Sequence, residues 1–285
     1  MKIYEKSLNE MKKIVARYTE QTIDFEIEKT VSEIIQNVAQ NGDQAVRDYE
    51  RKFDNVNLAD FSIPAFQLDQ ALDSIDEDLR AALELAKQNI TSFHQQEIEN
   101  SFVDVSTPGI MRGEKITPLA SVGLYVPGGT AAYPSTILMC GIPAKLAGVK
   151  RVVMVTPPQP AGINPAVLAA AKLAGVDEVY QVGGAQAIAA LAYGTETIPA
   201  VDKIMGPGNI FVATAKKQVF GKVAIDMVAG PSEIGILADE SANAKEIAAD
   251  LLSQAEHDKR ARAMLITNSK SLAEAVSKEI ERQLS

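Results

Sequence analysis

Two residues near the C-terminal end of the chain have the spacing of metal ligands. Gln254 and His257 are three positions apart in a segment predicted to be helical, so their side chains share one face. An amide oxygen and an imidazole nitrogen can bind the same metal ion. Zinc requires four ligands, however, and the chain has only two histidines, His94 and His257. The spacing alone leaves two interpretations open: half of a metal site, or an ordinary solvated helix end.

Glycine-containing turns follow several predicted strands and open the next predicted helix. They lie at residues 127–130, 183–186 and 206–209, with the sequences P-G-G-T, G-G-A-Q and G-P-G-N. Glycine lets a ligand approach the backbone and a helix N-terminus favours anions, so several such turns along one sheet edge would form a nucleotide crevice. The turns match neither G-x-G-x-x-G nor G-x-x-x-x-G-K-[ST]. Ordinary turns without a ligand therefore remain the alternative.

Two further side chains, Ser232 and Cys140, could act as nucleophiles. Ser232 has no histidine near it in the sequence to serve as a base, so we expect it to form hydrogen bonds instead. Cys140 lies in a predicted apolar helix, which favours a buried structural thiol. With one cysteine, the chain can form neither an internal disulfide nor a cysteine-cluster metal site.

Predicted strands and helices alternate from about residue 116 onward, and these elements must position the turns. We expect strands at residues 121–126, 151–156, 178–182 and 202–205, and helices at residues 134–148, 165–175, 185–193 and 209–220. Such alternation is typical of right-handed βαβ units that form a parallel sheet. The strands are apolar throughout, as in sheets covered on both faces. The sequence therefore predicts an α/β fold with a mostly parallel, doubly wound, Rossmann-like sheet.

The remaining segments divide the chain into three parts. Residues 1–115 carry apolar side chains at helical spacing, so we expect an N-terminal helical region that packs on the first α/β domain, residues 116–230. One of its helices should end at Asn41-Gly42. Residues 231–285 repeat the strand and helix pattern and predict the beginning of a second Rossmann-like domain. This part has too few strands for a sheet of usual size, so we expect a truncated chain.

The composition excludes several classes of protein. Of the 285 residues, 46% are hydrophobic and 23% are charged, as in a globular protein with a sizeable core. The 28 basic and 37 acidic residues give a net charge of −9, which argues against nucleic acid or an anionic membrane as a partner. The first residues contain no apolar core of the kind found in secretion signals, so we expect no such signal, and no apolar run reaches the roughly 18 residues that span a membrane. We therefore expect a cytoplasmic protein.

Five longer motifs follow one another along the chain. They are G-L-Y-V-P-G-G at 123–129, V-G-G-A-Q-A-I-A-A-L-A-Y-G-T-E at 182–196, D-K-I-M-G-P-G-N at 202–209, D-M-V-A-G-P-S-E at 226–233 and L-L-S-Q-A-E-H at 251–257. With these motifs in this order, the chain resembles the L-histidinol dehydrogenases. The resemblance covers essentially the whole chain, and five ordered motifs are far more specific than a single glycine pattern.

The resemblance implies an enzyme that oxidises L-histidinol to L-histidine through histidinal, in two NAD-dependent steps. This reaction is the last step of histidine biosynthesis. The resemblance also implies a homodimer. On the matching motifs, the cofactor NAD is expected to contact Tyr125, Gln186 and Asn209.

The resemblance further assigns a zinc ion (Zn2+) to the substrate site. It implies a substrate contact at Ser232, and joint contacts to zinc and substrate at Gln254 and His257. The family's Glu-His pair for proton transfer and its other zinc ligands are expected beyond Ser285, so no catalytic residue is assigned within this chain. We therefore expect the chain alone to be inactive, because oxidation of an alcohol requires a positioned base.

Two interpretations of function remain. The first is a truncated histidinol dehydrogenase. The alternative is a non-catalytic nucleotide-binding module or regulatory subunit on the same scaffold. A zinc-independent aldehyde dehydrogenase is disfavoured, because Cys140 does not lie in a turn that could present a nucleophile.

Overall fold

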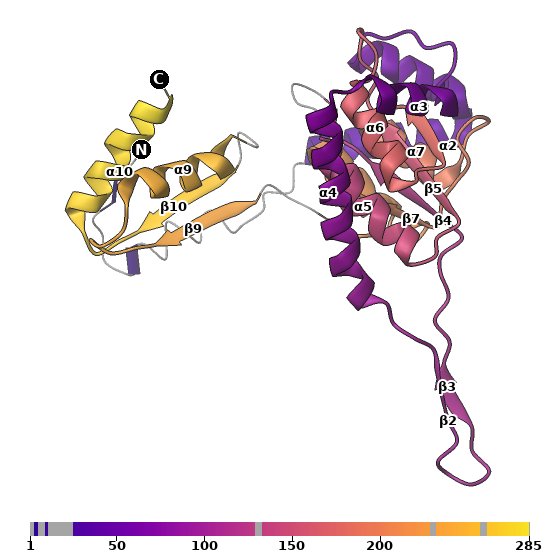
Figure 1. Ribbon diagram of the computed structural model, residues 1–285. Coiled ribbons are helices and arrows are strands. Elements are labelled where there is room, and N and C mark those ends of the chain that lie inside the picture. The colour runs from indigo at the N-terminus through magenta and orange to yellow at the C-terminus, as the bar shows by residue number, and fades with distance from the viewer. Residues whose placement is uncertain are drawn as a thin grey trace. The chain divides into compact units, whose positions relative to one another are not determined.

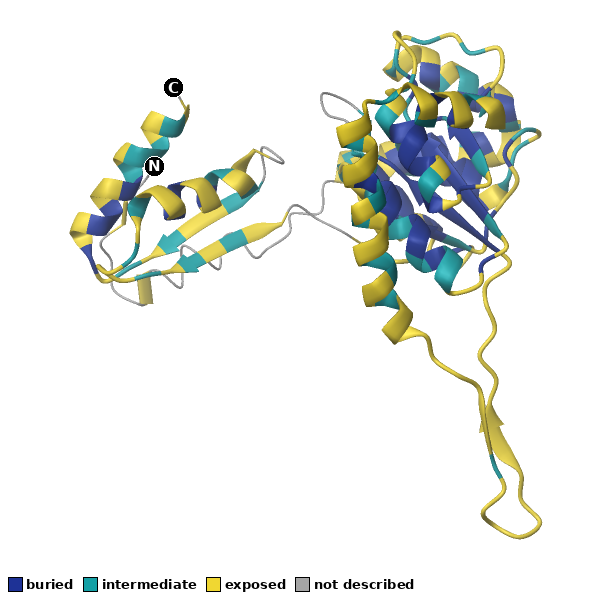
Figure 2. Cartoon of the chain, in the orientation of Figure 1, coloured by how far each residue is buried: buried dark blue, intermediate teal, exposed yellow. Residues whose placement is uncertain are grey.

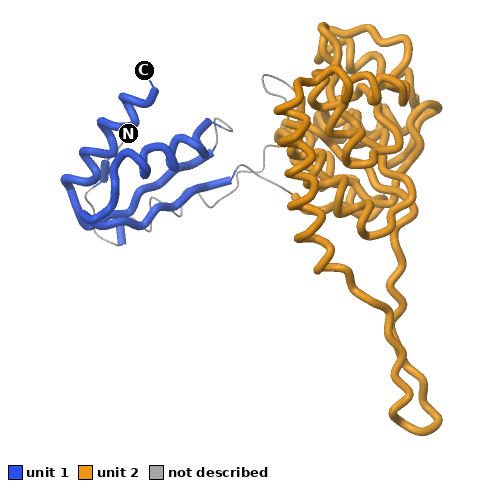
Figure 3. The backbone as a smooth tube through the Cα atoms, in the orientation of Figure 1, with its two compact units in different colours: residues 1–23, 230–285 blue, residues 24–229 orange. Residues whose placement is uncertain are grey.

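The computed structural model describes residues 3–4, 9–10, 25–128, 133–228, 232–256 and 261–284. Figure 3 shows its two compact units: residues 24–229 form the larger unit, and residues 230–285 with residues 1–23 form the smaller one. Within the described ranges, the helices lack the combination of length and hydrophobicity that is needed to cross a bilayer.

The described part of the larger unit is centred on a six-stranded sheet with the strand order β1-β6-β5-β4-β7-β8 (Figure 1). The parallel strands are β4 (Ser121–Tyr125), β5 (Arg151–Thr156), β6 (Glu178–Gln181), β7 (Lys203–Met205) and β8 (Ala224–Ile225). The first four lie where the apolar runs predict strands, so the predicted mostly parallel α/β sheet is confirmed. A short strand that the sequence pattern does not predict, β1 (Ser62–Ile63), pairs antiparallel with β6 at one edge.

The order of the parallel strands identifies the ligand-binding edge of the sheet. Across the sheet, the third, second, first, fourth and fifth parallel strands of the chain lie side by side. Dinucleotide-binding doubly wound folds have the same order. The direction of winding reverses between β4 and β7, and ligands in such folds bind beyond the carboxyl ends of the strands at this point. The topology therefore directs attention to the residues around Tyr125 and after Met205.

Helices cover both faces of the sheet, as Figures 1 and 2 show. One face carries α3 (Ala65–Ser74), α4 (Glu77–His94), α5 (Pro134–Leu146) and α6 (Pro165–Ala174), and the other carries α2 (Phe25–Phe53), α7 (Gly184–Tyr193) and α8 (Ile210–Val219). Successive residues of a strand point to opposite faces. In β5, Val152 and Met154 therefore join the core under α5 and α6, whereas Val153 and Val155 join the core under α2 and α7.

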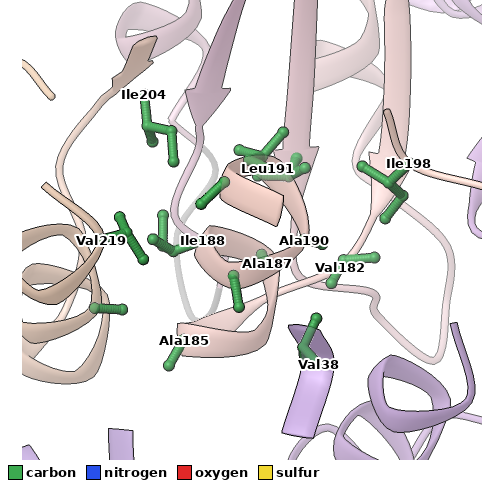
Figure 4. Close-up of a cluster of buried hydrophobic side chains, with 14 of the residues drawn as sticks. Val38, Val182, Ala185, Ala187, Ile188, Ala190, Leu191, Ile198, Ile204 and Val219 are labelled. Carbon is green, nitrogen blue, oxygen red and sulfur yellow. The ribbon is translucent and has the colours of Figure 1, made fainter. Parts of the chain in front are cut away.

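The core on the α7 face attaches the N-terminal helix to the sheet. Figure 4 shows Ile188 and Leu191 of α7 in one cluster with Val38 of α2, Val219 of α8 and Ile204 of β7, and all five side chains are fully buried. Burying a side chain of this size stabilises the fold by about 1.5–3 kcal/mol. This packing holds α2 against α7 and α8, the helices that begin at two of the glycine turns.

The region between residues 25 and 115 contains an exposed hairpin in addition to helices. Gly42, with φ of 51° and ψ of −133°, breaks α2 at the predicted Asn41-Gly42 boundary, and a second helical stretch follows directly. After the short helix η1 (Gln95–Glu97), β2 (Phe102–Asp104) and β3 (Arg112–Glu114) form an antiparallel hairpin. Figure 2 shows this hairpin projecting from the sheet with almost every residue exposed. We refer to residues 102–114 as the arm.

The smaller unit is a single βαβα segment in its described residues. β9 (Glu233–Leu237) and β10 (Arg262–Ile266) pair in parallel, and α9 (Ala244–Ala255) and α10 (Lys270–Leu284) follow them in the chain. Ile247, Leu251 and Val276 form its core with one face of the strands. The opposite face of the strands exposes Leu237 and Ile266.

Candidate functional site

A cavity of about 1080 Å³ opens at the carboxyl edge of the sheet in the larger unit. Its described lining from the strand ends consists of Tyr125, Pro127 and Gly128 at β4, residues 157–161 after β5, residues 184–186 after β6, and Asn209 and Phe211 after β7. Residues from all three predicted glycine turns therefore line one crevice. Residues 129–132, which include the end of the first turn, lie outside the described part of the chain.

Tyr125 is the last residue of β4 and is almost fully buried at the cavity. Its hydroxyl oxygen accepts a hydrogen bond from the backbone N–H of Gly184 at 3.1 Å. Burial raises the pKa of the phenol well above its usual value, and the nearby carboxyls of Glu50 and Asp54 raise it further. The phenol therefore keeps its hydrogen at neutral pH and is a neutral donor in the lining.

Gln186 lies in the first turn of α7, and its amide orientation is set by Glu50. The Nε2 of Gln186 donates to Oε1 of Glu50 at 2.9 Å, and the backbone N–H of Gly183 donates to the same oxygen at 3.1 Å. The amide oxygen of Gln186 then lies beside Gly184, where a Cβ atom would come within 2.7 Å of it. Gly184 has a φ of +59°, a conformation that favours glycine, and any side chain at this position would have to displace the Gln186 amide.

Asn209 is the N-cap residue of α8 and is exposed at the cavity. Its Oδ1 accepts hydrogen bonds from the backbone N–H groups of Phe211 at 3.0 Å and Val212 at 3.1 Å. Because the side-chain oxygen of Asn209 accepts the capping hydrogen bonds, the side-chain nitrogen is the group that can donate to a ligand in the cavity.

The turn that precedes Asn209 is held by a buried lysine. Lys216 of α8 donates through Nζ to the carbonyl oxygen of Gly206 at 2.9 Å and pairs with the carboxylate of Asp226. The other oxygen of that carboxylate accepts the N–H of Gly206 at 2.8 Å. Gly206 also contacts the end of β4 closely, since a Cβ atom at this position would lie 2.2 Å from the carbonyl oxygen of Tyr125. This contact joins the ends of β4 and β7 at the point where the winding of the sheet reverses.

Helix α2 and the residue after it supply a wall of the cavity that the sequence pattern does not predict. The lining residues there are Glu26, Ile27, Thr30, Ile34, Phe53 and Asp54. The apolar stripe of α2 indicates a packed face, but it carries no information about which part of the fold that face contacts. Residues 157–161 are also missed, because the turn after β5 is rich in proline instead of glycine. The signal that could have identified this turn is its position directly after a predicted strand.

The lining fits a dinucleotide better than it fits a highly charged anion. The volume lies just above the usual range of ligand cavities, which is about 300 to 1,000 Å³. Phe53 and Phe211 offer aromatic surface, and the backbone N–H groups of Ala185 and Gln186 in the first turn of α7 favour a pyrophosphate. The described lining includes the acidic residues Glu26 and Asp54 but neither lysine nor arginine. Backbone groups would therefore bind the phosphates.

In the smaller unit, the structure describes two of the three residues expected at the substrate and zinc. Ser232 is exposed just before β9, and Gln254 is half-buried in the last turn of α9. His257 lies outside the described residues. An amide and an imidazole supply two of the four ligands that zinc requires. The residues that the structure describes contain no cluster of three or more His, Cys, Asp or Glu side chains that could hold a metal ion. The donor set therefore fits half of a zinc site.

The two remaining candidates from the sequence lie outside the cavity lining. Cys140 is half-buried in α5, and burial raises the pKa of its thiol to about 11, so it is a poor nucleophile at neutral pH. His94 ends α4 and lies 2.5 Å from a carboxylate oxygen of Glu97, three residues further on. Neither side chain shows the surroundings of a catalytic group.

An open parallel sheet with a cavity at its topological switch point defines an α/β protein of the doubly wound class. The sequence model for histidinol dehydrogenase matches residues 17–285. The chain therefore belongs to the histidinol dehydrogenase family.

Individual relatives agree with this assignment over nearly the whole chain. The histidinol dehydrogenase of Lactiplantibacillus plantarum is 64% identical over 284 residues, which cover 100% of this chain and 66% of the relative. That of Streptococcus mutans is 59% identical over 261 residues, covering 92% of this chain and 61% of the relative. The crystal structure of histidinol dehydrogenase from Elizabethkingia anophelis has a TM-score of 0.87 and 38% identity, covering 98% of this chain and 65% of that one. The chain thus spans about two thirds of the length of these relatives.

Proposed function

We propose that this chain carries the NAD-contact part of an enzyme that oxidises L-histidinol to L-histidine through histidinal, the last step of histidine biosynthesis. The observation that carries the proposal is the convergence of Tyr125, Gln186 and Asn209 on one cavity. These residues belong to three separate motifs, and the resemblance assigns all three to NAD. The cavity lies at the sheet edge where dinucleotides bind in folds of this topology.

In this proposal, NAD supplies the hydride acceptor, and the chain binds and orients it. Asn209 donates a hydrogen bond through its amide nitrogen, and Tyr125 contributes a neutral phenol. Gly128 and Gly184 let the backbone approach the cofactor, and the N-terminal turn of α7 stabilises negative charge. Because the described lining includes no basic side chain, we expect modest affinity for NAD.

The substrate side of the reaction is proposed for the smaller unit. Ser232 contacts L-histidinol, and Gln254 and His257 contact both the substrate and a zinc ion. Zinc holds the substrate in place when it is bound. Hydride can leave the carbinol carbon only as the hydroxyl group loses its proton, so the reaction needs a base. We propose that the base and the other zinc ligands belong to the part of the relatives that this chain does not span.

We also propose that the protein acts in the cytoplasm as a homodimer. The support for a second copy as partner is the arm, a hairpin of two three-residue strands that is too short to be stable by itself. Its exposed apolar side chains include Phe102, Val103 and Met111. A second subunit of the homodimer would cover this surface.

Calorimetric titration of the purified chain with NAD tests the cofactor site. Asn209→Ala removes a helix cap and a cavity donor, so we expect affinity for NAD to fall about tenfold. The matched control is Asn164→Ala, which removes the corresponding N-cap from α6 and lies outside the cavity lining. Both variants should lose about 1 kcal/mol of stability, but only the first should lose affinity. Absence of NAD binding by the unmodified chain would contradict the proposal.

A further inference from the structure

Glu50 is a fully buried carboxyl group directly beneath the proposed NAD site. It lies in the last turns of α2, far from the glycine motifs in sequence, and has no accessible surface. None of the five motifs contains it. Burying a carboxyl group lowers the stability of the fold unless its oxygens are hydrogen-bonded or the group is neutral. The presence of Glu50 at this place therefore requires an explanation.

One oxygen of Glu50 connects the first turn of α7 to α2. Oε1 accepts both the N–H of Gly183, at 3.1 Å, and the Nε2 of Gln186, at 2.9 Å. With Nε2 committed to Glu50, the amide of Gln186 has a single orientation, in which its oxygen lies next to Gly184 in the cavity wall. Without Glu50, the amide could rotate by half a turn and exchange donor for acceptor.

The other oxygen of Glu50 lies near a second carboxyl group, that of Asp54, with which it can share a proton. Oε2 is fully buried and has no hydrogen-bond partner among the described residues, and the neighbouring acidic group is Asp54, the residue that follows α2. Among the described residues, the groups that face Glu50 are the Asp54 carboxyl just after its helix, the Tyr125 phenol from β4 and the neutral amides of Gly183 and Gln186 at the start of α7. Burial raises the pKa of Glu50 to about 8. At neutral pH, Glu50 is therefore mostly protonated and can donate to Asp54, which lines the cavity.

We propose that Glu50 is a positioning residue for the dinucleotide site, which holds the Gln186 amide and the Gly183 turn in the orientation that receives the cofactor. The inference rests on the proposed NAD site. Glu50 acts through Gln186 and does not line the cavity itself. Its neutral form fits both of its neighbours: Oε1 accepts from α7, and a proton on Oε2 can be donated to the Asp54 carboxyl group. Ionisation would place a second negative charge beneath a site that binds phosphates.

Two substitutions separate this role from general support of the fold. Glu50→Gln keeps a carbonyl acceptor for α7 and an N–H donor for Asp54, so it imitates the protonated acid. Glu50→Ala leaves the donors of Gly183 and Gln186 without their acceptor. The matched control is Glu33→Gln, at an exposed position of the same helix.

The experiment is calorimetric titration of the full chain with NAD between pH 6.5 and pH 9. We expect the NAD affinity of the unmodified chain and of the Glu33→Gln variant to fall above pH 8, whereas that of Glu50→Gln stays constant. We expect Glu50→Ala to bind NAD about tenfold more weakly than the unmodified chain does at pH 6.5, a loss typical of unsatisfied buried donors, and to show no fall above pH 8. In a Gln186→Ala background, Glu50→Ala should have a smaller further effect, because only the contact of Glu50 with the N–H of Gly183 then remains to be lost.

The possible failures are distinguishable. If the unmodified chain does not bind NAD, both the proposed function and this inference are wrong. If it binds NAD, but Glu50→Ala and Glu50→Gln match it in affinity and in pH dependence, only the inference is overturned. If Glu50→Ala does not fold, the pH profiles of the unmodified chain and of Glu50→Gln decide the question.

Discussion

Lys216 and Asp226 together bind both backbone polar groups of Gly206. The lysine Nζ donates to the carbonyl oxygen at 2.9 Å, and the aspartate carboxylate accepts the N–H at 2.8 Å. The two side chains also pair with each other, and the lysine side chain is only 2% exposed. This pair fixes the turn that carries Asn209 at the cavity, although neither charged residue lines the cavity itself.

Removal of the lysine should therefore loosen this turn. We expect Lys216→Met to lower the free energy of unfolding by about 3 kcal/mol, because it leaves Asp226 without its cation. NAD affinity should fall as well. The control is the neighbouring Lys217→Met, since Lys217 is 55% exposed and pairs with Glu28 on the surface, where such pairs are worth less than about 1 kcal/mol. Urea denaturation measures both variants, and equal losses would contradict the role of the pair.

Two glycines with similar backbone conformations should differ sharply when each is replaced by alanine. Gly206 has φ of +113° and no room for a Cβ atom, whereas Gly221 has φ of +102° and nothing within 4 Å of the added atom. Gly221→Ala should cost about 1 kcal/mol of backbone strain. Gly206→Ala should cost clearly more, because it must also separate the ends of β4 and β7. Thermal unfolding of the two variants tests this difference. Similar melting temperatures would show that the close approach of Gly206 to the end of β4 contributes little to stability.

The stability of the chain should depend on pH through Glu50. Burial raises the pKa of this group from 4.5 to about 8, so the folded state binds the proton more tightly than the unfolded state does. The stabilisation is complete below about pH 4.5 and is lost as the pH rises through about 8. Relative to Glu50→Gln, the unmodified chain should therefore lose a few kcal/mol between pH 5 and pH 9. Urea denaturation measures the free energy of unfolding of both proteins over this range. If the two free energies change with pH in the same way, the pKa of Glu50 is not raised in the folded state.

The arm should be required for association of two chains. Met111 in the arm is 78% exposed, and Met139 on α5 is 62% exposed, so both are accessible apolar side chains of the same type. We expect Met111→Glu to shift the chain from dimer to monomer, because a charge on an apolar contact surface must be desolvated. Met139→Glu should leave the dimer intact. Sedimentation velocity distinguishes these outcomes, and an unmodified chain that is monomeric at high concentration would refute the proposed homodimer.

The purified chain should not form NADH from L-histidinol at a meaningful rate. A positioned base contributes about 10²–10⁴-fold to proton transfer, and neither His94 nor Cys140 lines the cavity. A version extended to the length of the relatives should be active with zinc and NAD. In that version, His257→Ala should lower zinc content as well as turnover. Comparable NADH formation by both lengths would show that the base lies within this chain. NAD binding without turnover by the longer version would favour the non-catalytic module.

Local sequence patterns were sufficient to predict the parallel core of the central sheet, although not the antiparallel edge strand β1. The strands of a doubly wound sheet are buried on both faces, so each one is a short apolar run, and the helices between them show their own periodicity. The run at residues 151–156 predicts β5 with both of its ends, because Lys150 precedes it and prolines follow it. The glycine turns are likewise a local signal, and the family motifs contain Tyr125, Gln186 and Asn209.

The tertiary structure decided which distant segments complete the cavity. Glu50 lies 133 positions before Gly183, yet it accepts the N–H of that residue, and no periodicity in α2 indicates this contact. The reason is physical: an apolar stripe specifies that a helix face must be buried, but any apolar surface of suitable shape can bury it. The position of α2 on α7 and α8, and with it the carboxyl pair under Gln186, follows from how well these particular faces pack together.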